Sequence, residues 1–274
     1  MGKTHEALER AEKEHRENLL ETFFEPQKTI VPKESRQISN KTMVVKESRQ
    51  ISNKVMVVAE SKKIPVKTAP NRFQEVKSRL INRFPEGSIK TILITGTAHG
   101  CGSSTTAANF ATTLARDCSL NVLLVDANFR SPSLHEVFNI EYNQGLSQLL
   151  TKKEEETSFF KKVGHGNLYV LPCGENCSGP MNLFESNRFA KTLKNMREKF
   201  DYVIFDAPPV NGYLDSIAIC TKVDGVILVL ESGNARRQVA IKAKQELEEA
   251  GAKVLGVILN RRKHYIPECI YKRL

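Results

Sequence analysis

Six short apolar runs between residues 89 and 260 constrain the fold of this chain more than any other feature. The runs are nearly continuous in Val, Ile and Leu, the segments between them have helical periodicity, and the runs span residues 89–95, 121–126, 167–173, 201–206, 224–231 and 252–260. Strands of this composition are typical of a parallel sheet that helices cover on both faces. We therefore predict an α/β fold, a doubly wound domain that binds ligands at the carboxyl ends of its strands.

The chain before this domain begins with a helical pattern. Leu8, Ala11, His15, Leu19 and Phe23 recur at three- and four-residue steps among charged residues, which predicts an amphipathic helix within residues 1–25. Two interpretations remain open. The helix is either a charged element exposed to solvent or a docking element for a partner.

A tandem repeat follows this segment. Residues 33–45 and 46–58 have the same sequence except that Thr42 is replaced by Val55. Residues 26–70 contain ten Lys or Arg and three Glu, so they carry +7 of the net charge of +10. Because this segment has little material for a core, we predict a disordered basic linker. It is either a spacer or a weak electrostatic tether to anionic lipid.

The net charge and the cysteines bear on the partner and on the compartment. A charge of +10 favours an anionic partner such as a nucleotide, a nucleic acid or a membrane surface. The sequence contains no nucleic-acid recognition motif, so we expect no nucleic acid partner. The longest aliphatic run, Val226–Leu230, is far too short to cross a bilayer, and residues 1–14 lack the apolar stretch of a signal peptide. Six scattered cysteines without a C-x-x-C pair agree with a reduced, cytoplasmic protein.

The first predicted strand leads into a glycine-bearing turn and a helix rich in Ala and Thr. Gly100 and Gly102 allow backbone amides to surround an anion, and the helix directs its positive N-terminus to the same place. The phosphate-binding pattern G-x-x-x-x-G-K-[ST] is matched at Gly102 and at the Mg²⁺-binding hydroxyl position, Ser104. Ser103 replaces the lysine and Thr97 replaces the first glycine, so an ordinary strand-to-helix turn remains the alternative for this motif alone.

Two further strands end in a carboxylate. Asp126 ends the second predicted strand, and Asp206 ends a later one and is followed by Ala-Pro-Pro. A buried carboxylate is unfavourable unless its charge is used, and two of them above a phosphate loop can position Mg²⁺ or its waters. If they are kept for a ligand, replacing either by Asn is predicted to leave the stability of the unliganded protein unchanged or improved.

These motifs together resemble the bacterial tyrosine kinases of capsule and exopolysaccharide synthesis, a branch of the partition-type P-loop ATPases. The resemblance runs from Asn71 to Arg262. The family pattern LLIDADLRRPSLH is matched by LLVDANFRSPSLH, DYVIIDTPP is matched by DYVIFDAPP, and the loop ending G-x-G-K-[S/T]-T is matched by residues 100–105 apart from Ser103.

The resemblance implies a P-loop NTPase-type fold, ATP or ADP as the nucleotide, and Mg²⁺. Ser104 and Asp206 would hold the metal, and Asp126 would act with Asp206 in catalysis by serving the reacting hydroxyl or the metal. The nucleotide would be bound by the loop and by an Asn at the end of the last strand, at Gly100, Cys101, Gly102, Ser103, Ser104, Thr105 and Asn260. Asn260 falls where this superfamily often reads the base, although Asn at a strand end is also common in turns. For Cys101, a small side chain tolerated in the loop is favoured over an oxidisable thiol.

The chain also departs from the family pattern. Asn128 replaces the second acid of the D-x-D pattern, the assembly segment E-x-x-R-x-x-R is reduced to Asn71, Gln74 and Lys77, and Tyr265 and Tyr271 alone represent the tyrosine-rich tail. Together with Ser103, these losses indicate a divergent member with weak or absent kinase or ATPase activity. Arg130, Arg236 and Arg237 are candidates to replace the missing lysine.

The resulting hypothesis is a cytoplasmic nucleotide-binding component of exopolysaccharide or capsule synthesis or export. Its expected partner is a membrane-embedded polysaccharide chain-length or polymerisation protein, which would hold it at the inner face of the membrane. Association into a homodimer or larger homo-oligomer is left open. The alternatives are a non-catalytic docking module ordered by nucleotide and, less favoured, a cargo-partitioning ATPase. The predicted parts are residues 1–25 (helix), 26–70 (linker), 71–262 (kinase domain) and 263–274 (tail).

Overall fold

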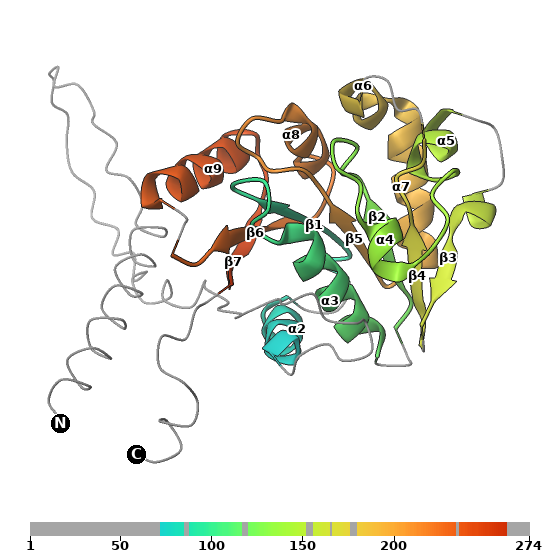
Figure 1. The fold of residues 1–274 in the computed structure, drawn as a ribbon, viewed down its shortest axis with the longest axis horizontal. Helices are drawn as coiled ribbons and strands as arrows, with labels where there is room; N and C mark the ends of the chain where they lie inside the picture. The colour runs from blue at the N-terminus through green and yellow to red at the C-terminus, as the bar shows by residue number, and fades with distance from the viewer. Residues whose placement is uncertain are drawn as a thin grey trace, which may run out of the picture. The chain divides into compact units, whose positions relative to one another are not determined.

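The computed structural model describes residues 72–84, 88–116, 120–151, 156–164, 166–175, 180–233 and 236–261. Their elements follow in the order α2 (Arg72–Arg83), β1 (Thr91–Gly96), α3 (Ser103–Ala115), β2 (Val122–Asp126), α4 (Leu134–Phe138), α5 (Leu146–Thr151), the 3-10 helix η1 (Glu156–Phe159), β3 (Lys161–Val163), β4 (Leu168–Leu171), α6 (Pro180–Glu185), α7 (Asn187–Lys199), β5 (Tyr202–Asp206), α8 (Leu214–Cys220), β6 (Gly225–Glu231), α9 (Arg237–Glu249) and β7 (Val254–Asn260) (Figure 1). The helix predicted within residues 1–25, the linker of residues 26–70 and the tail of residues 263–274 lie outside the described residues and stay predictions.

The described strands form one sheet in the order β3-β4-β2-β5-β1-β6-β7. All neighbouring pairs are parallel except β3 and β4, which are antiparallel. All six strands expected from the apolar runs are present, so the predicted parallel α/β sheet is confirmed. The sequence pattern missed β3, because its three residues include two lysines and show no apolar run. Lysines on a short edge strand discourage pairing with another chain.

Helices cover both faces of this sheet, as a doubly wound fold requires (Figure 1). On one face α3 contacts β1, β2 and β5, and α2 packs against α3; on the other face α7, α8 and α9 contact β5, β1 and β7 respectively. Each of α3, α7 and α9 has 13 residues. None of the described helices combines the length and apolar character needed to cross a bilayer.

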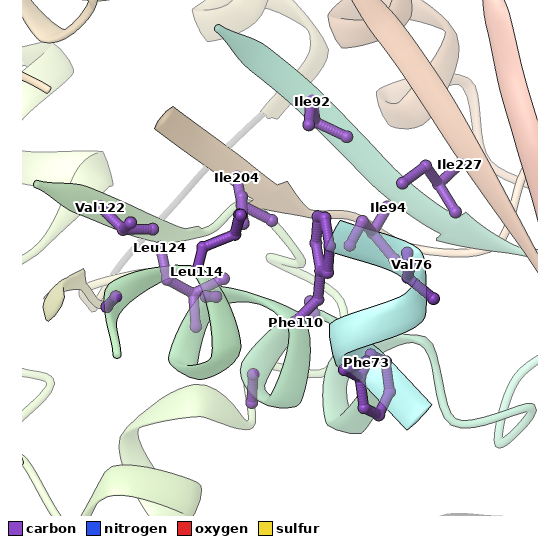
Figure 2. Close-up of a cluster of buried hydrophobic side chains, with 14 of the residues drawn as sticks. Phe73, Val76, Ile92, Ile94, Phe110, Leu114, Val122, Leu124, Ile204 and Ile227 are labelled. Carbon is purple, nitrogen blue, oxygen red and sulfur yellow. The ribbon is translucent and has the colours of Figure 1, made fainter. Parts of the chain in front are cut away.

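Helix α2, at the start of the predicted kinase domain, has an apolar stripe that belongs to the main core. Phe73, Val76 and Leu80 are three and four residues apart and almost fully buried. Figure 2 shows Phe73 and Val76 beside Phe110 of α3, within a cluster that continues to strand residues such as Ile94. Because full burial of each such side chain is favourable by about 1.5–3 kcal/mol, α2 is an integral part of this domain.

A polar cluster ties the amino-terminal ends of β1 and β6. The Asp224 carboxylate accepts hydrogen bonds from the backbone N–H groups of Lys90 and Thr91, at 2.9 and 2.8 Å, and from Arg197 at 2.7 Å. Burial opposes the charge on Asp224, but these donors outweigh it and hold the pKa of Asp224 below its usual value. The cluster is a structural tie at the end of the sheet opposite the predicted site.

Candidate functional site

The strand order brings the three predicted site segments together at the carboxyl edge of the sheet. β5 lies between β2 and β1, so Asp206 stands between Asp126 and the loop that follows β1. Asp126 is the register partner of Asp206, which pairs on its other side with Ile94. Register partners in neighbouring parallel strands direct their side chains to the same face, with backbones about 5 Å apart. The fold therefore makes the two predicted carboxylates neighbours.

The phosphate loop joins β1 to α3 and has the conformation expected of an anion cradle. Gly100 and Gly102 have φ values of +79° and +87°, a left-handed conformation that side chains other than glycine rarely adopt. Gly102 is the N-cap of α3 and supplies no side-chain cap. The predicted residues Ser103, Ser104 and Thr105 form the first turn of α3, where backbone N–H groups have no partner within the helix. These donors and the helix dipole favour an anion.

Cys101 packs into the protein from the middle of this loop. Its side chain is buried, and a Cβ atom on Gly96 would overlap the Cys101 sulfur. Burial raises the pKa of the Cys101 thiol, although hydrogen bonds around the loop partly oppose this effect. A thiol with a raised pKa is a poor nucleophile. The structure thus agrees with the interpretation of Cys101 as a small loop residue.

Asp126 is bound by the backbone of the segment that follows β2. One carboxylate oxygen accepts a hydrogen bond from the N–H of Asn128 at 3.2 Å, and the other accepts two from Ser133 and Leu134, both at 3.1 Å. Burial raises the pKa of Asp126 to about 6, and the backbone donors limit this rise. Asp126 therefore orders the connection between β2 and α4 in addition to facing the site.

Asp206 has the opposite surroundings. Its side chain is fully buried, and neither carboxylate oxygen accepts a hydrogen bond from a described residue. Burial and the neighbouring charge of Asp126 raise the pKa of Asp206 well above its usual value. The Ser104 hydroxyl is close enough to oppose this rise slightly, but its geometry is not that of a hydrogen bond. Buried polar atoms are nearly always paired, so two unpaired oxygens on one buried carboxylate point to a ligand.

This set of oxygens fits a divalent cation. Asp206 offers two unpaired carboxylate oxygens, the Ser104 hydroxyl is close to it, and Asp126 is its neighbour in the sheet. Hard cations such as Mg²⁺ prefer oxygen ligands and often use one or two carboxylates together with phosphate oxygens and water. The geometry is compatible with the predicted metal and catalytic roles of these residues, which stay predictions.

The arginines considered as substitutes for the missing lysine are placed differently. The Nε of Arg130 lies 3.0 Å from Asp215, a buried residue of α8, and its guanidinium lies over the ring of Tyr213. Arg236 and Arg237 are exposed at the start of α9. Arg130 is thus held at the rim of the site, while Asn128, at the position of the second family acid, accepts a hydrogen bond from the N–H of Ser131.

Two residues near the site were missed by the sequence analysis. Asp215 anchors Arg130, and Asn211 donates a hydrogen bond to the carbonyl of Thr97 at 2.9 Å. Both follow Asp206 within nine residues, so the continuation of that motif was the available signal.

Asn260 is buried at the end of β7, and its amide donates to the carbonyl of Cys101 at 2.9 Å. Its predicted contact with the base is not tested.

Comparison with known proteins places this fold among the P-loop NTPases. A family profile described as an AAA domain matches residues 89–238. The MinC:MinD cell division protein complex of Aquifex aeolicus shares the fold, with a TM-score of 0.54 at 21% identity over 67% of this chain and 72% of that chain.

Within that class the similarity is to bacterial tyrosine kinases. The tyrosine-protein kinase YwqD of Bacillus subtilis (strain 168) is 31% identical over 192 residues, which cover 70% of this chain and 81% of YwqD. The crystal structure of the chimerical protein CapA2B2 has a TM-score of 0.71 at 30% identity over 77% of this chain and 95% of that chain. The kinase domain of Escherichia coli tyrosine kinase ETK shares the fold, with a TM-score of 0.68 at 24% identity over 76% and 86%. The chain belongs to the bacterial tyrosine kinase family, which confirms the resemblance inferred from its motifs.

Proposed function

We propose that this chain is a nucleotide-binding member of the bacterial tyrosine kinase family that takes ATP or ADP with Mg²⁺ and transfers phosphoryl groups weakly or not at all. The observation that carries this proposal is the buried Asp206 carboxylate, which has no hydrogen-bond partner among the described residues and lies between Asp126 and the phosphate loop. A fold tolerates such a group where a ligand uses it.

Each site residue has a role in this proposal. The N–H groups of the loop and of the first turn of α3 bind the nucleotide phosphates. Ser104 and Asp206 hold Mg²⁺, which when bound supplies positive charge against the phosphate oxygens. Asp126, held by three backbone donors, orients the reacting hydroxyl or a water beside Asp206.

The weak transfer follows from what the loop lacks. Phosphoryl transfer depends on positive charge at the γ-phosphate, and loss of one preorganised stabilising group typically slows such a reaction about 10²- to 10³-fold. Ser103 stands where the family has a lysine, and Arg130, the arginine of the Asp126 motif, is paired with Asp215. Binding persists because backbone N–H groups supply most of the contacts to the phosphates.

The biological setting proposed here is exopolysaccharide or capsule synthesis or export. It rests on the family and on the similarity to the chimerical protein CapA2B2. The partner would be a membrane-embedded chain-length or polymerisation protein that holds the chain at the inner membrane face. Residues 71–262 would form the kinase domain, the helix within residues 1–25 would dock a partner, and residues 26–70 would act as a spacer or as a weak electrostatic tether to anionic lipid. Copurification with such a partner from the source cells tests this setting.

Calorimetric titration tests the nucleotide proposal directly. The intact chain is titrated with ADP and ATP, in MgCl₂ and again in EDTA. We expect both nucleotides to bind more tightly with Mg²⁺, and their affinities to be similar because the missing lysine acts mainly at the γ-phosphate. The Asp224→Asn variant is the matched control, since it alters a partly buried carboxylate at the opposite end of the same sheet. Absence of binding by the folded wild-type chain would refute the proposal.

Ser103 also favours a second candidate, a non-catalytic docking module that nucleotide orders. Turnover distinguishes weak phosphoryl transfer from none, and only the module requires that there be none. Wild-type chain is incubated with ATP and Mg²⁺, and phosphotyrosine and ADP are quantified by mass spectrometry and chromatography. Slow formation of either product, abolished in the Asp126→Asn variant, supports the weak kinase or ATPase. Nucleotide binding without any product supports the module.

A further inference from the structure

Two side-chain amides from outside the phosphate loop hold the carbonyl groups of that loop. Asn211, in the connection between β5 and α8, donates a hydrogen bond through Nδ2 to the carbonyl of Thr97 at 2.9 Å. Asn260, the last residue of β7, donates through Nδ2 to the carbonyl of Cys101, also at 2.9 Å. The two amides thus contact the beginning and the end of the loop from two different strand ends.

These hydrogen bonds determine where the N–H groups of the loop point. A trans peptide is planar, and its C=O and N–H groups point in opposite directions. Fixing the carbonyl of Cys101 therefore fixes the N–H of Gly102 on the other side, and fixing the carbonyl of Thr97 does the same for Ala98. Within the described part of the chain, neither N–H donates to a backbone carbonyl. The N–H of Gly102 remains available to an anion, whereas the N–H of Ala98 also faces the Cys101 sulfur.

The conformational freedom of the two glycines makes these hydrogen bonds from outside the loop necessary. Gly100 and Gly102 have φ values of +79° and +87°, and glycine populates both signs of φ readily. The peptide groups beside them can therefore rotate, and a rotated peptide would present a carbonyl oxygen to a phosphate. The sequence supplies no lysine at position 103 to bind phosphate oxygens in its place. Anion binding then depends all the more on correctly oriented N–H groups.

The amide of Asn260 is itself fixed. The residue is only 4% exposed, and its Oδ1 accepts a hydrogen bond from the N–H of Arg261 at 2.9 Å. Arg261 has a φ of +56°, an unusual value for a non-glycine residue, and its guanidinium is paired with Glu231 at 3.2 Å. Because Oδ1 binds the backbone, Nδ2 must face the loop. The backbone at the end of β7 therefore directs this donor toward the carbonyl of Cys101.

We propose that Asn260, assisted by Asn211, is a positioning residue that holds the phosphate loop in its anion-binding conformation. This inference rests on the proposed nucleotide-binding function and concerns the phosphates of the ligand rather than its base. Asn260 acts through the backbone of Cys101 and Gly102, so removal of its side chain weakens the binding of every ligand that carries a diphosphate. Base selectivity is left unchanged.

Inorganic pyrophosphate is the probe that separates phosphate binding from base reading, because it has no base. Wild-type chain and the Asn260→Ala variant are titrated in MgCl₂ with pyrophosphate, ADP and GDP. Loss of one buried hydrogen bond that leaves a carbonyl unpaired typically weakens binding by about tenfold. We expect that loss for pyrophosphate and for ADP alike, with the ratio of ADP to GDP affinity unchanged. Unchanged pyrophosphate affinity with a collapsed ADP to GDP ratio would overturn the inference and assign Asn260 to the base.

Two further variants control for folding. Asn211→Ala removes the second hold from a partly exposed loop, and we expect about threefold weaker pyrophosphate binding, since exposed hydrogen bonds contribute less. It also carries the test if Asn260→Ala does not fold, because unchanged pyrophosphate binding would then overturn the inference. Gln148→Glu is the matched control: its amide donates to the carbonyl of Glu175 at 2.7 Å, in the loop after β4, and its loss is expected to leave pyrophosphate affinity unchanged.

The outcomes also distinguish failure of this inference from failure of the proposed function. If the folded wild-type chain binds neither pyrophosphate nor ADP, the nucleotide-binding function itself fails. If wild-type chain binds both ligands and a folded Asn260→Ala variant binds pyrophosphate equally well, only the positioning role fails. An equal loss in Gln148→Glu and Asn260→Ala would show a general effect of stability and would also overturn it.

Discussion

Asp126 at the end of β2 and Asp206 at the end of β5 are register partners, and both are fully buried, yet their surroundings differ. Asp126 accepts three backbone hydrogen bonds, whereas Asp206 accepts none from the described residues. Burial raises the pKa of both, to about 6 for Asp126 and well above the usual range for Asp206. Backbone donors account for the smaller rise at Asp126.

The difference shows that two acids in one site can be retained for different reasons. Asp126 accepts hydrogen bonds from the connection between β2 and α4, so both of its oxygens are paired even without a ligand. The charge of Asp206 is used only when a cation or another donor reaches it, and until then it opposes folding. A ligand that supplies a cation or a hydrogen-bond donor to Asp206 therefore stabilises the folded protein by binding to it. Three experiments test this contrast, and a fourth tests the loop beside the two carboxylates.

The largest effect is expected from Asp206→Asn on binding. Replacing the carboxylate removes the charged oxygens offered to Mg²⁺, and we expect the affinity for ADP in MgCl₂ to fall about a hundredfold, equivalent to about 2.8 kcal/mol. Affinity for ADP in EDTA changes much less. Titration calorimetry of wild type, Asp206→Asn and the Asp224→Asn control measures both. A variant that retains Mg²⁺-dependent affinity would show that Asp206 does not contact the metal.

The next effect concerns the loop rather than the carboxylates. Ser103→Lys installs the missing cation, and we expect ATP to bind more tightly by about 1.5–3 kcal/mol while ADP changes less, because a charge-assisted hydrogen bond forms at the γ-phosphate. Titration of both proteins with both nucleotides decides this. If wild type already prefers ATP strongly, another cation occupies the place of the lysine. Arg130 would then have to leave Asp215, which the Arg130→Ala variant would reveal.

The contrast between the two aspartates also shows where sequence reasoning succeeds. Both carboxylates were predicted because each ends a buried apolar strand, and such strands also gave the parallel sheet. Their different hydrogen bonding was not predictable, because the donors Ser133 and Leu134 lie seven and eight residues beyond Asp126, past an irregular turn. The ties from Asn211 and Asn260 to the loop depend on strand order, which apolar runs do not specify. The short, lysine-containing β3 has no pattern to detect.

The pH dependence of stability is the third test. The native state holds protons on the pair at pH values where the unfolded chain has released them, since the unfolded pKa of Asp is about 3.9 and the native pKa of Asp126 is about 6. Stability of the unliganded protein therefore falls as pH rises through this window, by roughly 2 kcal/mol or more between pH 4 and pH 7. Urea denaturation at several pH values measures the trend.

Other groups also titrate in this range, so the reference is a variant that lacks both carboxylates, Asp126→Asn with Asp206→Asn. Asp224 has the opposite sign, because its lowered pKa adds stability above the unfolded pKa and loses it as pH falls. Subtracting the pH profile of the double variant removes Asp224 and the histidines. A difference profile that is flat or that rises with pH would contradict burial as the cause of the raised pKa values.

The smallest effect tests the contrast most directly, by making the same substitution at both strand ends in the absence of ligand. From sequence alone, Asn at either position was predicted to leave stability unchanged or improved. The structure separates the two positions. Asp126→Asn keeps one oxygen but turns the other into a donor that faces backbone N–H groups, which loses at least one hydrogen bond and lowers the free energy of unfolding by about 1 kcal/mol. Asp206→Asn removes a buried carboxyl group whose ionisation is opposed by burial and by Asp126, and raises stability by about 1 kcal/mol at neutral pH. Urea denaturation of both variants in EDTA gives the two signs, and Mg²⁺ with ADP should stabilise wild type more than Asp206→Asn. If both variants changed the free energy of unfolding in the same direction, the backbone donors at Asp126 would not distinguish it from Asp206. The division of roles between the two strand ends would then have to be abandoned.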